Sequence, residues 1–416
     1  MFKKITNLNN WIILILLPAG IIIFLSVLLV RPLLIIRFGE IMTYRIGHSL
    51  RPLEIYLANK QLEKNTKFFK KKIDIFFFSS IHCNQFLKII CKRSILTAPF
   101  QLTYFPFKIL KWLSTFSKFF EKNIINMRIY DFDRNNALDK TRQVLSFTKS
   151  EIEKGDKLLE KFNINKNDKI VCFATRDNNY LNKYLTYPNQ ANPEYNLRNS
   201  DVETYKFAAE ELVKLGYKVI RSGKYPEKKI SFSNLNIIDY AASAHSSDFL
   251  DIYLPYRCDF AFGDTSGWST IAMAFRKHFA FVNWHTFATL DYSSKKNIFI
   301  FKKFYSKDKE KILSLNDIKK ENLYDARSHD LERKNIRLID NTPEEIKDLV
   351  IEVEKIYNGE LVLSEKDLQL QEKFRNYVTN EFSDLIKICY PNQAPDSNTE
   401  NLISCGTNFL KNIKFS

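Results

Sequence analysis

Two polar loops in the middle of the chain carry the residue types best suited to holding an anion. In the first, the apolar residues 171–174 predict a buried strand, and Arg176 and Asp177 follow where that strand ends. A guanidinium presents a rigid fork of N–H donors that matches two phosphate oxygens. Arg176 is therefore a candidate ligand for a diphosphate. An internal ion pair between Arg176 and Asp177 is the alternative interpretation.

The second loop joins an apolar strand at residues 260–262 to an apolar helix. The loop reads Gly263-Asp264-Thr265-Ser266-Gly267. Hydroxyls and free backbone N–H groups at the beginning of a helix favour a bound anion such as a pyrophosphate. An ordinary Ser or Thr helix cap explains the same pattern. Between the two loops, Arg198 and Asn199 stand at the mouth of a further helix, which Ser200 or Asp201 would cap.

The placement of glycine supports both loops. The chain has 10 glycines in 416 residues, against an average of about 7%. A chain with so few glycines is expected to keep them where the backbone needs a positive φ or approaches another group closely. Four of them fall at ends of strands or helices in this region: Gly216, Gly223, Gly263 and Gly267. Gly216 is expected only to end a helix.

Acid–base chemistry has two candidates. His48 lies in a loop after the first expected strand, and Asp177 is a carboxylate of the first polar loop. Either could take up a proton, although a purely structural role is the alternative for His48. No GxSxG elbow, HExxH motif or Walker A loop is present. The six cysteines and six histidines show no metal-ligand spacing, so we expect neither a metal nor a cofactor.

Alternating strands and helices must position these residues. Strands are expected at residues 33–38, 73–78, 124–130, 169–175, 218–222, 237–239, 260–262 and 279–283, and helices at 52–60, 201–215, 247–253 and 269–275. Gly39 and Gly47 are expected to follow the first strand. Short buried strands separated by helices predict a parallel, doubly wound sheet, and two such units predict an α/β chain of two Rossmann-like lobes. Ligands are then expected in a cleft at the carboxyl ends of the strands.

The N-terminus suggests a membrane. Residues 11–30 carry no charge, with Lys3 and Lys4 before them and Arg31 after them. This length fits a transmembrane helix. The alternatives are a signal peptide, and a helix that lies in the membrane interface or is buried in a hydrophobic partner. The predicted divisions are an anchor (1–31), a first lobe (32–134), a helical linker (135–165), a second lobe (166–360) and a helical tail (361–416).

The charge of the chain does not indicate nucleic acid as a partner. Its 63 Lys and Arg against 47 Asp and Glu give a net charge of +16. The basic residues are scattered, and no nucleic-acid-binding module is recognisable.

The ordered motifs resemble a known family. RIGH at 45–48, CFATRDNNYL at 172–181, LRNSDVETY at 197–205, CDFAFGDTSGWS at 258–269 and FAFVNW at 279–284 look like those of bacterial glycosyltransferases of surface-polysaccharide loci. That family is similar in outline to GT-B O-fucosyltransferases. The resemblance covers residues 45–283 and extends more loosely to Leu410. It departs at Arg221-Ser222-Gly223, where the family often carries RMG.

The resemblance implies a metal-independent GT-B glycosyltransferase. Its donor cleft would hold Arg176, Asp177, Arg198 and Asn199, with Gly263, Asp264, Thr265, Ser266 and Gly267 at the diphosphate and His48 in the first-lobe loop. Such an enzyme moves a sugar from a nucleotide-sugar donor to a glycan or a lipid-linked acceptor in surface-polysaccharide synthesis. Since nucleotide sugars are cytosolic, the catalytic part is expected on the cytoplasmic side of a single-pass anchor. A non-catalytic membrane-tethered scaffold and a nucleotide-sugar hydrolase or epimerase are the alternatives.

Overall fold

The computed structural model describes residues 17–63, 71–184, 193–232, 234–290, 294–389 and 403–416. The chain divides into two compact units, Met1–Asp131 and Phe132–Ser416. Each unit has its own parallel sheet. The chain is therefore an α/β protein, as the alternation of strands and helices predicts.

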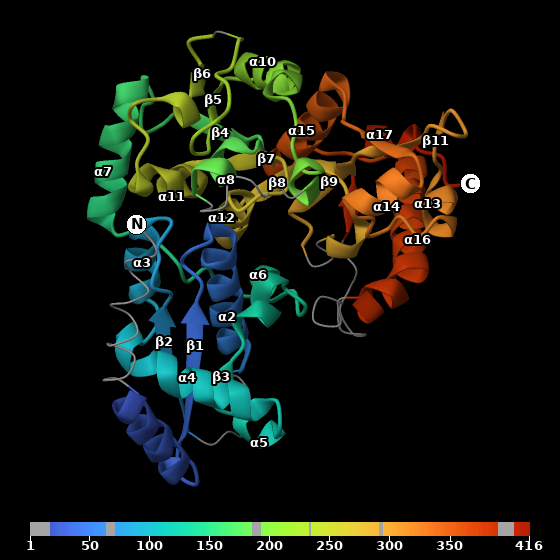
Figure 1. Ribbon diagram of the computed structural model, residues 1–416. Coiled ribbons are helices and arrows are strands. Elements are labelled where there is room, and N and C mark those ends of the chain that lie inside the picture. Colours follow the sequence, from blue (N-terminus) through green and yellow to red (C-terminus); the bar gives the residue numbers. More distant parts are fainter. Residues whose placement is uncertain (1–16, 64–70, 185–192, 233, 291–293, 390–402) are drawn as a thin grey trace. The chain divides into compact units, whose positions relative to one another are not determined.

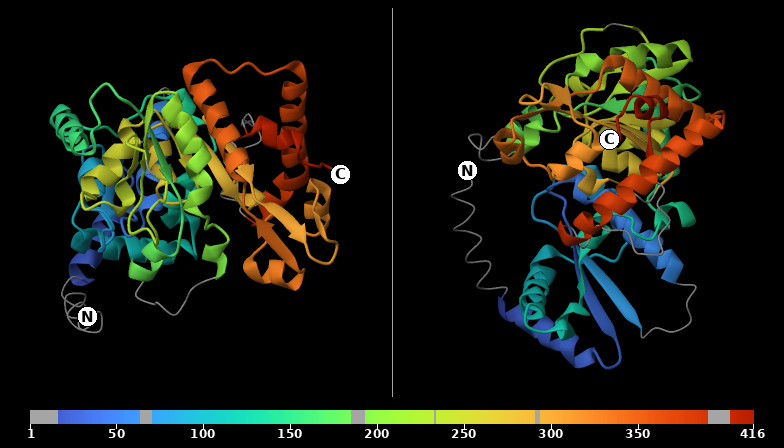
Figure 2. Two further views of the ribbon diagram at one scale, coloured as in Figure 1. Left: turned by 90° about the horizontal axis from the view of Figure 1, so that it is seen from above. Right: turned by 90° about the vertical axis from the view of Figure 1, so that its right-hand side faces the viewer.

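The first unit is built on a three-stranded parallel sheet in the order β2-β1-β3. Its strands are β1 (Ile35–Ile41), β2 (Lys72–Phe78) and β3 (Ile124–Ile125), and β1 and β2 are the two blue arrows in the right-hand view of Figure 2. On these neighbouring strands Arg37 pairs with Asp74 through two hydrogen bonds of 2.5 and 2.7 Å. This ion pair ties the two strands together at a matched register position.

Two expectations for this sheet are wrong. Gly39 does not follow the first strand but lies inside it, where an added Cβ would meet the Phe76 ring at 2.8 Å. Close packing, and not a turn, explains this glycine. The strand expected at 124–130 stops after two residues, and the 3₁₀ helix η2 (Met127–Asp131) follows. The reason is local, because the Asn126 side chain accepts the backbone N–H of Arg128 at 3.2 Å and turns the chain.

Helices cover this sheet. They are α2 (Leu50–Glu63), α3 (Gln85–Lys92), α4 (Phe100–Ser114) and α5 (Lys118–Glu121), with the short 3₁₀ helix η1 (Ile46–His48) after β1. The helix expected at 52–60 is confirmed as the middle of α2. Phe38 and Phe77 from the strands and Phe107 and Leu110 from α4 form one buried cluster.

Residues 17–30 form a helix that packs against α4 (Figure 1, dark blue). Val27 belongs to the buried cluster of this unit, and an added Cβ on Gly20 would lie 2.5 Å from Phe105. Within the described residues, no helix is long and apolar enough to cross a membrane. The expected transmembrane helix at 11–30 begins outside the described residues, and its described part is this packed helix.

The second unit is built on a seven-stranded, all-parallel sheet in the order β13-β9-β8-β7-β4-β5-β6. Its strands are β4 (Lys169–Ala174), β5 (Tyr217–Arg221), β6 (Ile237–Asp239), β7 (Phe260–Gly263), β8 (His278–Trp284), β9 (Asn297–Phe301) and β13 (Ser404–Cys405). The five strands expected between residues 169 and 283 are confirmed. Their short apolar runs are buried on both faces, as parallel sheets require.

The strand order creates a switch point between β4 and β7. After β4 the chain adds β5 and β6 on one side and then returns to place β7 on the other. Helices α10 (Lys206–Lys214) and α15 (Pro343–Asn358) cover one face, and α11 (Asp248–Arg257) and α12 (Ser269–Ala274) cover the other (Figure 1). Because the connections leave β4 and β7 toward opposite faces, their loops diverge and leave room for a ligand.

Glycine allows the close pairing at this switch point. Gly263 ends β7 with φ of 142°, and an added Cβ would lie 2.1 Å from the carbonyl oxygen of Ala174 in β4. Gly216 follows α10 with φ of 87° and open space around it, which confirms its expected role in ending that helix. Behind these loops, the rings of Phe173 and Phe262 stack with centroids 5.2 Å apart in the core.

The segment expected as a linker packs onto the second unit. It contains α6 (Ala137–Lys140) and α7 (Lys149–Leu159), which begins with a capping box of Thr148 and Glu151. The Tyr253 hydroxyl of α11 donates to the carbonyl of Ile152 at 3.1 Å, and Gly155 lies against the same ring.

The remaining elements complete the second unit. They are α8 (Asn179–Tyr184), α9 (Pro193–Asn196), α13 (Leu315–Lys320), α14 (Ser328–Arg333), α16 (Glu365–Cys389), α17 (Thr407–Lys411) and a small antiparallel sheet of β10 (Lys303–Ser306), β11 (Lys311–Ile312) and β12 (Ile336–Ile339). The C-terminal segment expected as a helical tail also supplies β13. This short strand forms one edge of the large sheet beside β9.

Candidate functional site

Asp264 fastens the loops at the switch point together. Its side chain directly follows β7 and the residue is 1% exposed. The carboxylate accepts hydrogen bonds from Ser200 Oγ at 2.6 Å, Tyr205 Oη at 2.8 Å, the Arg176 backbone N–H at 2.8 Å and Asn283 Nδ2 at 3.3 Å. Burial raises the pKa of Asp264, and these donors oppose that rise. With both oxygens engaged, Asp264 positions the loops around it.

Arg176 is the first cation that this arrangement positions. Its backbone is held by Asp264, and its Nε is buried without a hydrogen-bond partner in the described structure. Burial, followed by the charge of Arg198, lowers the pKa of Arg176 to about 10. The guanidinium carbons of Arg176 and Arg198 lie 5.6 and 5.7 Å from the centre of the Tyr195 ring. Two guanidinium groups therefore share one aromatic ring, each within cation–π range.

Further cations gather at the ends of the next strands. Lys302 directly follows β9, is 3% exposed, and donates to the carbonyl of Asn199 at 2.8 Å. It also pairs with Asp340 at 2.8 Å. His285 directly follows β8. Burial lowers its pKa to about 3, with further lowering by the charges of Arg198, Lys302, Arg327 and Arg176.

His285 has its pKa lowered chiefly by burial and to a lesser degree by nearby cations. It lies among four cationic side chains, and repulsion from like charges disfavours its protonated form. The most central carboxylate, that of Asp264, is already occupied by four donors. Lys302 is buried, Arg176 and Arg198 are half-buried, and the Arg327 side chain is 50% exposed and pairs with Asp325 at 3.4 Å. Such a group of guanidinium and ammonium ions near the carboxyl ends of parallel strands is suited to an anion such as a phosphate or diphosphate. The structure brings Arg176, Arg198 and the carbonyl of Asn199 together in this cluster, and their role as donor ligands stays a prediction. The Oδ1 of Asn199 is also buried without a partner in the described structure.

Asp177 lies in a different hydrogen-bonding environment. Its two carboxylate oxygens accept the backbone N–H groups of Asn179 at 3.0 Å and Glu227 at 2.8 Å. It forms no ion pair with Arg176 in the described structure, so the internal salt bridge considered from the sequence is not seen. In this state the carboxylate fixes the loop after β4 to the loop that contains Glu227.

The glycine- and serine-rich loop is closed by its own hydrogen bonds. Ser266 and Ser269 exchange backbone-to-hydroxyl bonds at 3.2 and 3.3 Å, and Thr270 Oγ1 donates to the carbonyl of Gly267 at 2.7 Å. Thr265, Ser266 and Gly267 are partly exposed. The hydroxyls act as in an ordinary turn that begins a helix, the alternative that the sequence left open.

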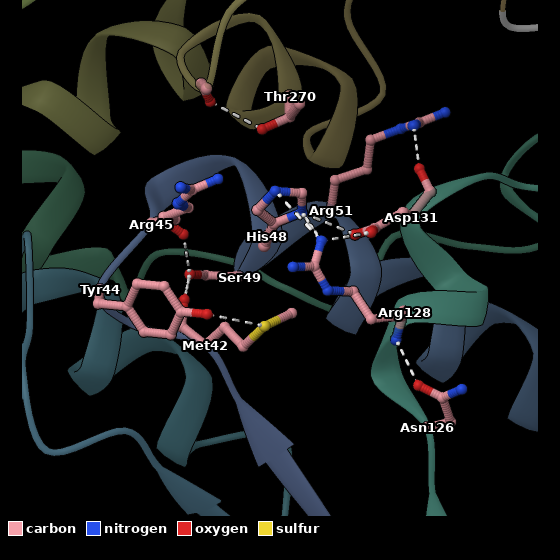
Figure 3. Close-up of polar contacts among 11 residues, drawn as sticks. Met42, Tyr44, Arg45, His48, Ser49, Arg51, Asn126, Arg128, Asp131 and Thr270 are labelled. Atoms are coloured by element: carbon pink, nitrogen blue, oxygen red, sulfur yellow. Dashed lines mark hydrogen bonds and ion pairs between the residues drawn. The ribbon is translucent and has the colours of Figure 1, made fainter. Parts of the chain in front are cut away.

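His48 lies in the first unit, in η1 after the carboxyl end of β1 (Figure 3). Its Nδ1 is 3.0 Å from Oδ1 of Asp131, and Arg128 Nη1 lies 3.3 Å from the other oxygen of that carboxylate. Arg51 of α2 donates to the Asp131 backbone carbonyl at 2.6 Å. Arg128 Nη1 is also 3.4 Å from His48 Nε2. When Nδ1 donates to Asp131, Nε2 is the basic nitrogen, which is the arrangement that a general base needs.

Sequence reasoning missed several of these residues, although a signal existed for some. His285 and Lys302 each directly follow an apolar strand, and Arg176 comes two residues after one. Applying the same strand-end rule to these positions would have found both. Asp131, Tyr195 and Arg327 gave no comparable signal, because they lie in irregular segments or short helices.

Fold and site together define an α/β protein with a doubly wound parallel sheet and a cationic cluster beside its switch point. No protein-family model and no curated protein sequence matches the chain.

Some solved structures are similar to part of the chain. The glycosyl transferase family 9 protein from Veillonella parvula is 10% identical, with a TM-score of 0.39 over 65% of this chain and 86% of that one. The E. coli ADP-heptose LPS heptosyltransferase II is 12% identical, with a TM-score of 0.38 over 64% of this chain and 90% of that one. At these values the likeness carries no argument about activity.

Proposed function

We propose that the chain is a glycosyltransferase that takes a sugar from a nucleoside diphosphate donor. The observation that supports this most directly is the grouping of Arg176 and Arg198 around the Tyr195 ring, with Lys302 bonded to the carbonyl of the adjacent Asn199. In such a transfer the bond between the sugar's anomeric carbon and the diphosphate breaks, and negative charge builds up on the leaving diphosphate. Fixed cations in a partly buried site stabilise that charge and so lower the barrier. In this proposal the arginines and the lysine perform the task that a metal ion performs in other transferases.

The acceptor hydroxyl must lose a proton as its oxygen bonds to the anomeric carbon. We assign that proton to Nε2 of His48, which Asp131 orients through Nδ1. Asp177 is the weaker candidate, because both of its oxygens hold backbone N–H groups. The sequence motifs are the basis for three finer parts of the proposal. These are the GT-B type, the kinship with O-fucosyltransferases, and a glycan or lipid-linked acceptor in surface-polysaccharide synthesis. Because nucleotide sugars are cytosolic, the proposal also places the catalytic part of the chain on the cytoplasmic side of the membrane.

Nucleotide binding tests the proposal. We expect the UDP, GDP or ADP that matches the donor to raise the melting temperature of the purified chain, while the corresponding nucleoside does not. Arg176→Ala and Arg198→Ala should each weaken binding by about tenfold to a hundredfold, because each removes a charge-assisted contact worth roughly 1.5–3 kcal/mol. Lys214→Ala, at the far end of α10, is the matched control, and its binding should equal that of the wild type.

Product analysis distinguishes transfer from its rivals. Incubation with the matching nucleotide sugar and a membrane or glycan extract should yield a glycosylated product. Free sugar without an acceptor product would indicate a hydrolase, and binding without turnover would indicate a scaffold. Equal binding of diphosphate by the wild type and Arg176→Ala would contradict the assignment of the cationic cluster as the diphosphate site.

A further inference from the structure

The helix of residues 17–30 is apolar on two opposite faces. One face packs on α4 through Gly20, Val27 and the partly buried Ile23 and Phe24. The opposite face carries exposed aliphatic side chains, namely Leu17, Ile21, Ile22, Leu25 and Leu29. Leu29 is 81% exposed. Leu33, just beyond the helix, is 85% exposed. We call these six exposed residues the aliphatic face.

This exposure is unusual for a helix at the surface of a folded unit. Surface helices normally place polar residues on the side away from the core, whereas helices that are apolar all round are covered on all sides. Contiguous exposed apolar patches mark interaction sites. In its isolated state the first unit therefore presents an apolar surface that needs a covering.

Aromatic side chains on α4 and α5 add to the apolar surface of the same unit. Trp112 and Phe116 are exposed, and their rings meet edge to face with centroids 5.3 Å apart. The Arg31 guanidinium at the end of the helix lies 3.4 Å from the centre of the exposed Phe119 ring and donates to the Phe119 carbonyl. This contact joins the end of the aliphatic helix to α5. Exposed aromatics beside aliphatic side chains are typical of surfaces at the membrane–water boundary.

The charges beside this surface are almost all positive. Residues 17–30 carry no charge, and the adjacent Arg31 is 8% exposed and lies against the Phe119 ring. Residues 100–122 contain four exposed lysines, Lys108, Lys111, Lys118 and Lys122, and one carboxylate, Glu121. A protein partner of mixed charge has no need of such an imbalance, but anionic lipid headgroups attract it at about 1 kcal/mol for each basic residue near the surface.

We propose that the aliphatic face, with the exposed aromatics and lysines of α4 and α5, binds the surface of an anionic phospholipid bilayer. The aliphatic side chains enter the boundary between headgroups and acyl chains, and the lysines contact the headgroups. Residues 17–30 then lie in the interface, because their other face is packed on α4. The surface lies wholly within the first unit and does not depend on the cationic cluster of the second unit. The proposal of membrane binding and the proposal of sugar transfer can therefore fail independently.

Vesicle flotation of the full-length chain tests this surface. The purified wild-type chain should float with vesicles of phosphatidylcholine and phosphatidylglycerol, and much less with phosphatidylcholine alone. Raising the salt should reduce binding, since the lysine contribution is screened. The triple variant Ile22→Ser/Leu25→Ser/Leu29→Ser should bind at least about tenfold more weakly, because each buried CH₂ contributes about 0.8 kcal/mol to insertion.

Two further variants keep the result specific. Leu235→Ser and Val362→Ser remove aliphatic side chains that are 93% and 90% exposed in the second unit, and together they form the matched control. They should float like the wild type. Lys108→Glu/Lys111→Glu changes only charge, so it should lose the preference for phosphatidylglycerol even if the serine variant proves unstable by thermal unfolding.

Three outcomes would overturn the proposal. The first is a wild-type chain that ignores both kinds of vesicle. The second is a dimer in solution that the triple serine variant dissociates, which would assign the aliphatic face to a second copy of the chain. The third is wild-type protein that resists extraction from vesicles by alkaline carbonate, which would indicate a spanning helix. Nucleotide binding, measured on the same samples, should not respond to any of these variants.

Discussion

At the scale of one residue, His285 links the cationic cluster to the stability of the folded chain. Its imidazole is half-buried, and burial together with the charges of Arg198, Lys302, Arg327 and Arg176 lowers its pKa to about 3. In the unfolded chain the same group has a pKa near 6.5. Below pH 6.5 the unfolded state therefore takes up a proton that the folded state refuses, so folding stability must fall as the pH falls toward 3.

The stability of the chain should therefore be sensitive to mild acid. Between pH 7 and pH 5 the His285 contribution should lower the free energy of unfolding by about 2 kcal/mol. His278, whose pKa burial lowers to about 4, acts in the same direction. Urea denaturation at the two pH values should show the loss, and His285→Asn should reduce the pH dependence by that amount. His329→Asn, on the exposed side chain of α14, is the control and should keep the wild-type dependence. If His285→Asn left the pH dependence of the free energy of unfolding unchanged, the half-buried cationic environment of His285 would be contradicted.

At the scale of elements, the sequence predicts the second sheet well and the small elements poorly. Strands β4, β5, β7 and β8 are runs buried on both faces, so their apolar residues stand out against polar loops. Strand β13 has two residues and β11 is exposed on both of its residues, so neither leaves such a pattern. The strand expected at 124–130 failed because the Asn126 side chain bonds the Arg128 N–H and replaces a ladder hydrogen bond.

Gly263 offers a test at the same scale. Its φ of 142° and the 2.1 Å between an added Cβ and the Ala174 carbonyl mean that any side chain would force β7 away from β4. Gly263→Ala should lower the free energy of unfolding by at least about 3 kcal/mol, which combines backbone strain with steric overlap. It should also abolish nucleotide binding, since Arg176 and Asp264 flank this pairing.

Gly359→Ala is the matched control for that substitution. Gly359 also has a positive φ, 73°, but no atom lies within 4 Å of an added Cβ. Its replacement should cost about 1 kcal/mol from the left-handed backbone alone. Chemical denaturation of both variants measures the difference. Equal losses would mean that φ, and not the approach of β4, determines the need for glycine at 263.

At the scale of the whole molecule, the candidate site shows what a single sequence cannot supply. Arg176, His285 and Lys302 are far apart in sequence, and each ends a strand of one sheet. A pattern of residues can place each at a strand end, but the strand order decides which ends are neighbours. That order depends on the crossovers that return the chain from β6 to β7. The loops after β4 and β7 stand out in the sequence because of their Arg and Gly-Ser residues. The strand-end rule also reaches His285 and Lys302, but only the strand order shows that these cations are neighbours of Arg176.

The proposed role of His48 as the general base can be tested directly. If its Nε2 takes the acceptor proton, His48→Ala should leave nucleotide affinity unchanged and slow transfer by about 10²–10⁴, the usual contribution of a general base. Asp131→Asn should give a smaller loss and shift the pH profile of the rate, because Asp131 acts by orienting the ring. His245→Ala, an exposed histidine of the second unit, is the control for both. Calorimetry with the matching nucleoside diphosphate, together with single-turnover rates, separates binding from chemistry. A His48→Ala chain that transfers sugar at the wild-type rate would remove the first unit's histidine from the mechanism, while leaving the arginine and lysine cluster of the second unit untouched.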